Sequence, residues 1–149
     1  MGEHRPTSTL SYTDTVRPEW IDYNGHLSEP YYVLVFGDAT TAMMDAVGLD
    51  AEYRGRTGAS LYTVEAHVRY LREVDPDAKL HVTTSVISTG AKKVRFCHEM
   101  RVDGTLVATE ELLALHVDGA RSAPFPDTVL ARLNTYVCPA PEYAGRSIS

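Results

Sequence analysis

Cysteine, long apolar runs and positive charge are all scarce in this sequence of 149 residues, and each shortage excludes a class of protein. The two cysteines, Cys97 and Cys138, form no metal-type or redox-type pair. A chain of this length needs no disulfide, so they fit a reducing compartment. No apolar run reaches the roughly 18 residues of a membrane helix, and the first residues hold neither a secretory signal nor a myristoylation motif. We therefore expect a cytoplasmic protein that is not inserted in a membrane.

The charge balance is acidic, with a net charge of −6. This argues against nucleic acid as a partner, because binding to a phosphate backbone requires a basic surface. A single anionic ligand needs only a local basic cluster, and Lys92, Lys93 and Arg95 provide one. The six histidines show no spacing typical of metal ligands, so the sequence predicts no metal site.

Length and composition predict a single domain over residues 1–149. The 44% of hydrophobic and 23% of charged residues are typical of a globular protein. A chain of this size can bury one sizeable core but is too short for two ordinary domains. No internal repeat or linker interrupts it, and the residues from about 139 to 149 are expected to form a loosely ordered tail.

The most informative stretch is residues 17–47, a polar loop followed by an apolar helix. Ser28 is placed to cap the helix, Pro30 fits its first turn, and Gly48 is expected to end it. Apolar side chains at three- and four-residue spacing predict a helix with one face against a sheet; they are Tyr32, Val35, Phe36, Ala39, Met43, Ala46 and Val47.

Alternating segments before and after this helix predict strands. The first covers residues 9–16, and four longer ones follow the helix with short connections. In the first of these four, one face is expected to hold Tyr62, Val64, Ala66, Val68 and Tyr70, and the other Thr63, Glu65, His67 and Arg69. One long helix with consecutive strands implies an α+β fold, an antiparallel sheet wrapped around the helix. Because such a sheet leaves an unpaired edge strand, a homodimer that joins two edges is expected.

Several segments resemble a known family. Residues 20–26 (Trp-Ile-Asp-Tyr-Asn-Gly-His), followed by an apolar helix, resemble the loop of hotdog-fold acyl-CoA thioesterases of the 4-hydroxybenzoyl-CoA thioesterase type. Further segments are similar to the betainyl-CoA thioesterases that accompany carnitine dehydrogenase; they are residues 36–40, 62–69, 115–118 and 144–148. The resemblance covers roughly residues 12–148. It implies a hotdog fold, a homodimer or possibly a tetramer, and hydrolysis of a coenzyme A thioester without a cofactor, with betainyl-CoA as the leading substrate.

Thioester hydrolysis needs a group that activates water or attacks the carbonyl, and donors that hold the developing negative charge. Asp22 matches the family's catalytic carboxylate, as general base or as nucleophile. Gly25 and His26 lie just before the helix, where free amides favour an anion, and Asn24 can orient water. Without the resemblance, Asp22, Asn24 and Gly25 are equally typical of a simple turn, and His26 of a loop residue bound to backbone.

A betainyl group carries a quaternary ammonium, which aromatic faces and a nearby carboxylate can hold. The candidate rings are Trp20, Tyr23, Tyr31, Tyr32 and Tyr62, with Glu65 as the counter-charge. For Tyr32 and Tyr62, packing in the core is the alternative, and for Glu65 a solvated strand face. The resemblance places Lys92, Lys93 and Arg95 in the basic hairpin that meets the coenzyme A phosphates, although exposed turns often carry lysine as well.

Three further residues favour structural interpretations. Asp38 is expected to anchor the helix to its neighbours, His67 to be solvated, and His98 to be a hydrogen-bonded core histidine. Two other functions remain open, a non-catalytic acyl-CoA-binding protein and a hydratase. The hydratase signature places Asp and His five apart with Asn-Pro between them, whereas Asp22 and His26 are four apart with Asn-Gly between them.

Overall fold

The computed structural model describes residues 10–148. Along the chain, strands and helices follow one another in this order: β1 (Leu10–Thr15), a short 3-10 helix (Pro18–Trp20), α1 (Glu29–Val47), α2 (Ala51–Thr57), β2 (Ala59–Tyr70), β3 (Lys79–Thr89), β4 (Lys93–Val102), β5 (Thr105–Asp118), β6 (Arg121–Ser122) and α3 (Asp127–Thr135). The predicted first strand begins at Thr9, which lies outside the described residues, and the rest of it is found as β1.

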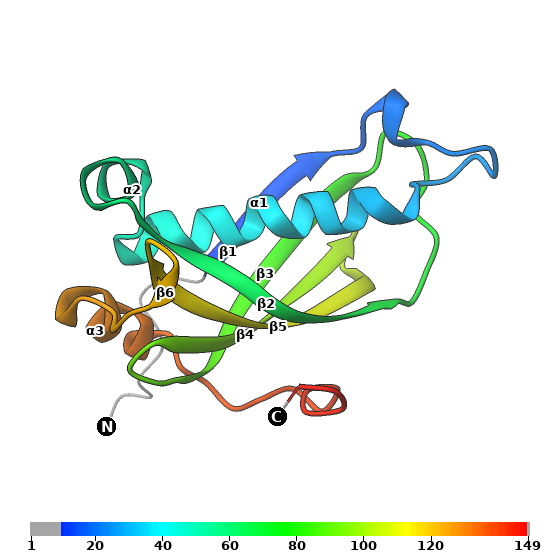
Figure 1. The fold of residues 1–149 in the computed structure, drawn as a ribbon. Helices are drawn as coiled ribbons and strands as arrows, with labels where there is room; N and C mark the ends of the chain where they lie inside the picture. The colour runs from blue at the N-terminus through cyan, green and yellow to red at the C-terminus, as the bar shows by residue number, and fades with distance from the viewer. Residues whose placement is uncertain (1–9, 149) are drawn as a thin grey trace, which may run out of the picture.

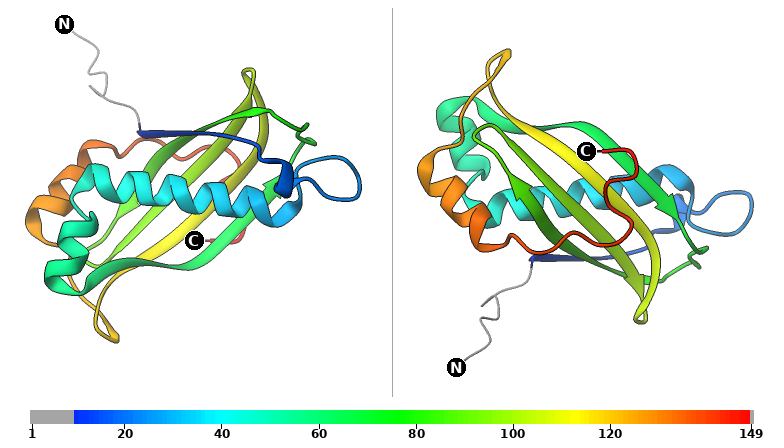
Figure 2. Two further views of the ribbon diagram at one scale, coloured as in Figure 1. Left: turned by 90° about the horizontal axis from the view of Figure 1, so that it is seen from above. Right: turned by 90° about the horizontal axis from the view of Figure 1, so that it is seen from below.

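The sheet is antiparallel, with the strands in the order β1-β3-β4-β5-β2 and the short β6 beside β5. Figure 1 shows the sheet curving around α1, and Figure 2 shows α1 running along the length of the strands. The helix packs most closely against β1 and β3. This confirms the predicted α+β architecture, the hotdog arrangement of one long helix held in a curled sheet.

The bounds of α1 follow from the residues predicted to set them. Ser28 is the N-cap residue, although its side chain makes no capping hydrogen bond, and Pro30 lies in the first turn. Gly48 ends the helix with φ +97°, a left-handed conformation that glycine adopts without strain. Among the described residues no single helix is both long and apolar enough to cross a membrane. Only α1 and α2 taken together meet that test, and they are bent by 77°. The cytoplasmic location stays a prediction.

Two apolar clusters hold α1 against the sheet. Val35 and Phe36, both fully buried, belong to the cluster around the first half of the helix. Met43 and Val47 belong to the cluster around the second half, which α3 also covers. Each fully buried side chain of this kind contributes about 1.5–3 kcal/mol relative to an exposed one. The predicted apolar stripe is confirmed except at Ala46, which is exposed.

Polar side chains within the core also tie α1 to the sheet. His98 is completely buried, with Nε2 2.8 Å from Thr40 Oγ1 on the helix and Nδ1 2.8 Å from Thr84 Oγ1 on β3. Burial lowers the pKa of His98 to about 3, so the ring is neutral. The hydroxyl of Tyr12 on β1 donates to Asp14 Oδ2 at 3.0 Å and also lies 3.5 Å from Asp38 Oδ2 on the helix. The structural interpretations of His98 and Asp38 are therefore confirmed.

A β-bulge in β2 corrects the predicted alternation of that strand. The register against β5 shifts between Thr63 and Glu65, so Val64 is an extra residue in the strand. Beyond the bulge the predicted face holds: Ala66, Val68 and Tyr70 pair with Leu112, Glu110 and Ala108 on the side that faces α1. Before the bulge the faces are exchanged. Tyr62 therefore lies on the outer face with Glu65 and is 56% exposed.

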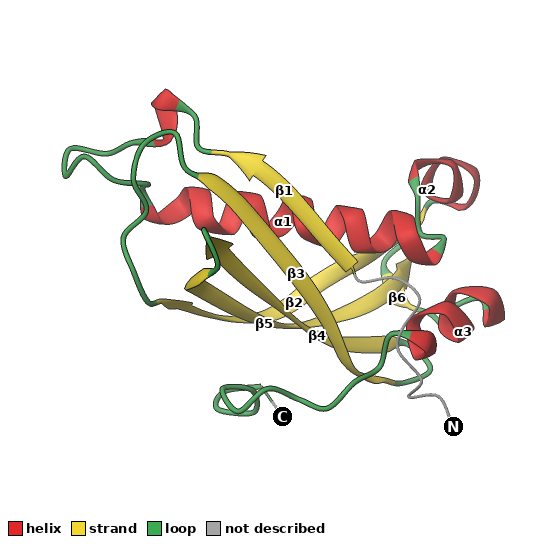
Figure 3. Ribbon diagram, turned by 180° about the vertical axis from the view of Figure 1, so that it is seen from behind, coloured by secondary structure: helices red, strands yellow, loops and turns green. Residues whose placement is uncertain are grey.

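The last residues are also more ordered than predicted. Figure 3 shows the C-terminal segment on the side of the sheet opposite to α1. There Gly145 N donates to both carboxylate oxygens of Glu111 at 3.0 and 3.1 Å, and the hydroxyl of Tyr143 donates to Glu99 Oε2 at 3.0 Å. Ile148 is 2% exposed. The expected loose tail is thus wrong over residues 139–148, because two carboxylates on the sheet, the buried Glu111 and the partly buried Glu99, hold it.

Candidate functional site

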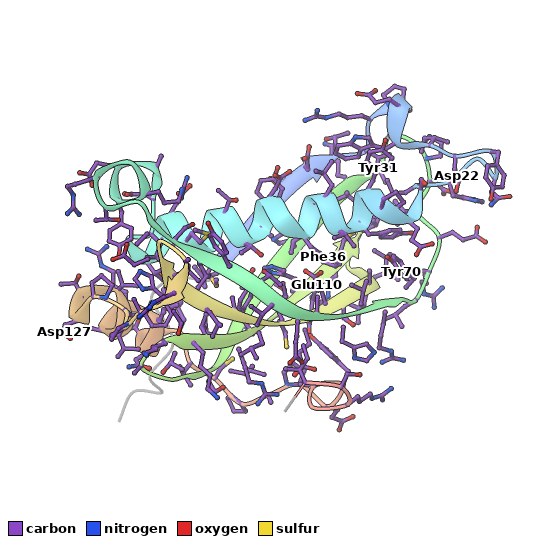
Figure 4. All side chains as sticks on the ribbon, in the orientation of Figure 1. Asp22, Tyr31, Phe36, Tyr70, Glu110 and Asp127 are labelled. Atoms are coloured by element: carbon purple, nitrogen blue, oxygen red, sulfur yellow. The ribbon has the colours of Figure 1, made fainter. Side chains whose placement is uncertain are left out.

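A pocket of about 740 Å³ opens beside the N-terminal end of α1. Three segments build it: the loop before the helix, the first turn of the helix, and the end of β2 with the connection that follows. Its lining residues are Asp22, Asn24, His26, Leu27, Glu29, Tyr32, Tyr70, Leu71, Arg72 and Glu73. Figure 4 shows the loop with Asp22 at this end of α1 and Tyr70 below the helix.

The loop that carries Asp22 is closed by its own backbone. Ile21 and Leu27 form an isolated bridge, and within it Asp22 N donates to His26 O at 3.0 Å. Asp22 Oδ1 accepts the amide of Asn24 at 2.8 Å. Within residues 10–148 the other oxygen, Oδ2, has no hydrogen-bonding partner. Asp22 therefore forms the predicted turn and still presents one free carboxylate oxygen at the pocket.

Gly25 shapes this loop. Its φ of +79° is unfavourable for other residues, and its amide donates to Asp22 O at 3.0 Å. The expectation that the Gly25 amide is free for an anion is therefore wrong. The amides of Leu27 and Ser28 are likewise bonded, to Val74 O and Trp20 O. Those of His26 and Glu29 have no hydrogen-bonding acceptor among the described residues.

His26 pairs with the connection between β2 and β3. Its Nε2 lies 2.9 Å from Glu73 Oε2 and 3.7 Å from Asp75 Oδ1. Glu73 also lines the pocket, so the two residues form one wall of it. The contact holds the Asp22 loop against the segment after β2, and the ring of His26 contacts Glu73 rather than Asp22.

Two tyrosines form the aromatic part of the pocket. Tyr32 is 4% exposed, and its hydroxyl donates to Arg72 O at 3.2 Å. The rings of Tyr32 and Tyr70 meet edge to face, with centroids 5.1 Å apart. The pKa of Tyr32 is raised by burial first and then by the nearby groups of Tyr70, Glu73 and Asp22.

Trp20 and Tyr23 lie outside the pocket. Trp20 is 4% exposed because Tyr31 stacks on its ring at 5.6 Å, and the Arg17 guanidinium lies over the ring at 5.0 Å. No open face remains for a ligand cation, so the structure gives Trp20 and Tyr31 a packing role. Tyr23, at the tip of the loop, is 97% exposed.

Two other predicted groups are not brought to the pocket within one chain. Tyr62 faces outward because of the bulge in β2, and Glu65 lies on the outer face as its predicted alternation with Ala66 requires. Lys92 lies in the connection between β3 and β4, and Lys93 begins β4. Figure 1 shows this connection near α3, at the opposite end of α1 from the Asp22 loop. Arg95 is already paired: its Nη2 lies 2.9 Å from Glu111 Oε2 and 3.2 Å from Ile148 O.

Sequence reasoning missed several residues of the site. Glu29, Tyr70, Arg72 and Glu73 line the pocket, and none of them has a spacing that marks it. A buried carboxyl group outside this lining, Glu110, was missed as well, although two adjacent glutamates interrupt an apolar strand at residues 110 and 111. Burial raises the pKa of Glu110 to about 7. No group of three His, Cys, Asp or Glu within residues 10–148 is arranged to hold a metal ion.

Comparison with known proteins identifies the family of the chain. The thioesterase-like superfamily matches residues 16–133. The betainyl-CoA thioesterase of Pseudomonas aeruginosa is 41% identical over 147 residues, 93% of this chain and 92% of that protein. The L-carnitine dehydrogenase/betainyl-CoA thioesterase of Agrobacterium fabrum is 41% identical over 136 residues, which are 87% of this chain but only 28% of that longer protein.

Solved structures agree on the fold. A putative thioesterase from Pseudomonas putida superposes with a TM-score of 0.82 and 39% identity, and 97% of each chain is covered. A hypothetical protein from Staphylococcus aureus, solved in complex with CoA, has a TM-score of 0.89 and 24% identity, and 99% of each chain is covered. At that identity the second likeness supports the fold alone.

Proposed function

The chain belongs to the thioesterase-like superfamily, and from this premise we propose that it hydrolyses betainyl-CoA to betaine and coenzyme A, with Asp22 as the reacting carboxylate. The enzyme class follows from the family and from the relative that shares 41% of its residues over nearly the whole chain. The substrate and the role of Asp22 are the proposed parts. The observation that carries them is an acidic pocket with two tyrosines and one free carboxylate oxygen.

Asp22 suits either route of thioester hydrolysis. As a general base, its free Oδ2 accepts a proton from water while the water attacks the thioester carbonyl. As a nucleophile, the same oxygen attacks the carbonyl, and water then hydrolyses the mixed anhydride. In both routes the hydrogen bond from the Asn24 amide fixes the orientation of the carboxylate, and coenzyme A leaves as the thiol.

The negative charge that develops on the carbonyl oxygen needs donors. The amides of His26 and Glu29 have no acceptor within residues 10–148, and Glu29 begins α1, where the helix dipole favours an anion. We assign the oxyanion to this pair of amides, with the ring of His26 held aside by Glu73. The proposed reaction uses only water and these groups, so it needs no cofactor.

The charge of the pocket favours a cationic acyl group. Asp22, Glu29 and Glu73 line it together with a single arginine, Arg72. A quaternary ammonium has no hydrogen to donate, so it binds to aromatic faces and anionic charge. The Tyr32 and Tyr70 pair provides the rings, which supports betainyl-CoA as the substrate, the compound that the relative from Pseudomonas aeruginosa is named for.

A homodimer brings the coenzyme A site together in this proposal. β2 is an edge strand of the sheet, and Tyr62 and Val64 on it are about half exposed. Antiparallel pairing of two β2 edges places the start of one strand beside the end of the other. The end of β2 carries Tyr70, so each pocket then lies near the half of the second copy that carries Lys92 and Lys93. These lysines are the proposed partners of the coenzyme A phosphates.

The proposed reaction is tested by mixing the protein with a panel of acyl-CoA compounds and a thiol reagent. Release of coenzyme A from betainyl-CoA faster than from acetyl-CoA supports the proposal. Hydrolysis of other thioesters without betainyl-CoA overturns the substrate but not the enzyme class. Binding without release of thiol indicates an acyl-CoA-binding protein instead.

A further inference from the structure

Glu110 is a buried carboxyl group that the proposed reaction does not use. It lies on the inner face of β5 and is 3% exposed. No hydrogen bond or ion pair reaches its carboxyl group from residues 10–148. Its oxygens are not among the side-chain atoms that are fully buried without a partner, so they keep a small contact with solvent, but the burial of the rest of the group still costs stability.

The residues around Glu110 do not neutralise it. Its cross-strand neighbours are Val68 on β2 and His98 on β4. Both ring nitrogens of His98 are bonded to threonines, and the ring is neutral. Phe36, stacked on His98 at 5.7 Å, belongs to the core cluster above this part of the sheet. Among residues 10–148, therefore, no cationic side chain on the inner face neutralises Glu110.

Tyr70 connects Glu110 to the pocket. It lies on the same face of β2, two residues beyond Val68, and lines the pocket with 44% of its surface exposed. Its pKa is raised by burial first, and then by the nearby carboxylates of Glu29 and Glu110. Figure 4 shows Tyr70 and Glu110 below α1, with Tyr70 nearer the end of the helix that carries the Asp22 loop. The carboxyl group of Glu110 therefore lies on the core side of Tyr70, close to the pocket.

We propose that Glu110 is the counter-charge that makes the enzyme select a trimethylammonium acyl group, which binds against the rings of Tyr70 and Tyr32. This inference rests on the proposed function and names the residue that determines its acyl specificity. Glu110 thereby takes the role that the sequence suggests for Glu65, which lies on the outer face of β2.

The physical reason is the difference in dielectric between the two sides of Tyr70. Glu29 is exposed, so water and salt screen its attraction for a cation in the pocket. Glu110 is enclosed by protein, where the same attraction is screened less. A cation on the face of Tyr70 also offsets the unpaired charge behind it. A neutral acyl group of the same shape gains neither effect.

The test compares two substrates of equal shape, betainyl-CoA and tert-butylacetyl-CoA, in which carbon replaces the charged nitrogen. For Glu110→Gln we expect kcat/KM for betainyl-CoA to fall at least about tenfold, mostly through KM, while the value for tert-butylacetyl-CoA stays within about twofold. Glu142→Gln removes the same charge from the exposed C-terminal segment, away from the pocket and from β2, and should change neither value. Glu110→Asp keeps the charge and should retain part of the preference.

The outcomes separate the two claims. If the wild-type enzyme shows no preference for betainyl-CoA, both the substrate and the role of Glu110 are wrong. If the preference survives in Glu110→Gln, or if both substrates lose equally, only the role of Glu110 is wrong. Should Glu110→Gln fail to fold, Tyr70→Leu answers the same question from an exposed position, because removing the ring should abolish the preference while Tyr70→Phe retains it.

Discussion

Glu110 and Glu111 are neighbours on β5 and are almost equally buried, at 3% and 1% exposed, yet their surroundings differ completely. Glu111 points to the outer face, where it pairs with Arg95 at 2.9 Å and accepts the amide of Gly145. Glu110 points to the inner face, where no cation and no hydrogen-bond donor from residues 10–148 contacts its carboxyl group. Burial raises its pKa to about 7. Side chains alternate across a strand, so one position along the chain separates a structural charge from one available to a ligand.

The largest expected effect on stability is that of breaking the outer pair. Glu111→Gln leaves Arg95 without its partner in a mostly buried place and should lower the free energy of unfolding by about 3 kcal/mol. Activity per folded molecule should change little, because Glu111 is not in the pocket. Urea denaturation at pH 7 measures the loss. The matched control is Glu52→Gln, whose partner Arg56 is on the surface, with an expected loss below about 0.5 kcal/mol. Equal losses of stability in Glu111→Gln and Glu52→Gln would show that burial does not strengthen the contribution of the Glu111–Arg95 pair.

Glu110→Gln should have the opposite effect on stability, with a dependence on pH. The folded protein holds the Glu110 proton more tightly than the unfolded chain does, because its pKa is raised from 4.5 to about 7. In the wild type, the stability that the Glu110 proton contributes is therefore fully present below pH 4.5 and is lost as the pH rises through about 7. Glutamine has no proton to lose. At pH 8 the variant should be more stable than the wild type by about 2–3 kcal/mol, and near pH 4 the two should agree. A difference that is the same at both pH values would contradict the assigned burial.

The smallest effect is expected at Glu29, the exposed carboxylate on the other side of Tyr70. Because water screens it, Glu29→Gln should change the preference for betainyl-CoA over tert-butylacetyl-CoA by less than about threefold. The measurement is the ratio of kcat/KM for the two substrates. An effect as large as that of Glu110→Gln would mean that burial does not decide which carboxylate selects the cation.

Most of the fold was predicted from apolar residues that recur with the period of a helix or alternate as in a strand. Helix α1 follows from the spacing of its apolar residues, with Pro30 and Gly48 at its ends. The prediction that Tyr62 faces α1 was wrong because one extra residue, Val64, exchanges the two faces of the strand before it. No local residue type marks that bulge. The prediction of a loose C-terminal segment was wrong because the residues that hold this segment, Glu99 and Glu111, are distant from it in the sequence.

The site was predicted in part, for the same physical reasons. Asp22, Asn24, His26 and Tyr32 line one pocket, since a loop and the helix that follows it stay together. Trp20 was expected to hold a cation, but Tyr31 and Arg17 cover its faces, and stacking of this kind depends on tertiary packing. Lys92 and Lys93 lie at the other end of α1, so their role depends on an assembly that one chain does not contain.

The central claim is that the carboxylate of Asp22 splits a bound thioester. Its most direct test is the turnover of betainyl-CoA by the wild-type enzyme and by Asp22→Asn, followed by thiol release, with circular dichroism and size-exclusion chromatography to establish that both fold and assemble alike. Asparagine keeps the hydrogen bond from the Asn24 amide but cannot act as base or nucleophile, so we predict a loss of at least about a hundredfold in kcat. Near-normal turnover by the folded variant would contradict the account.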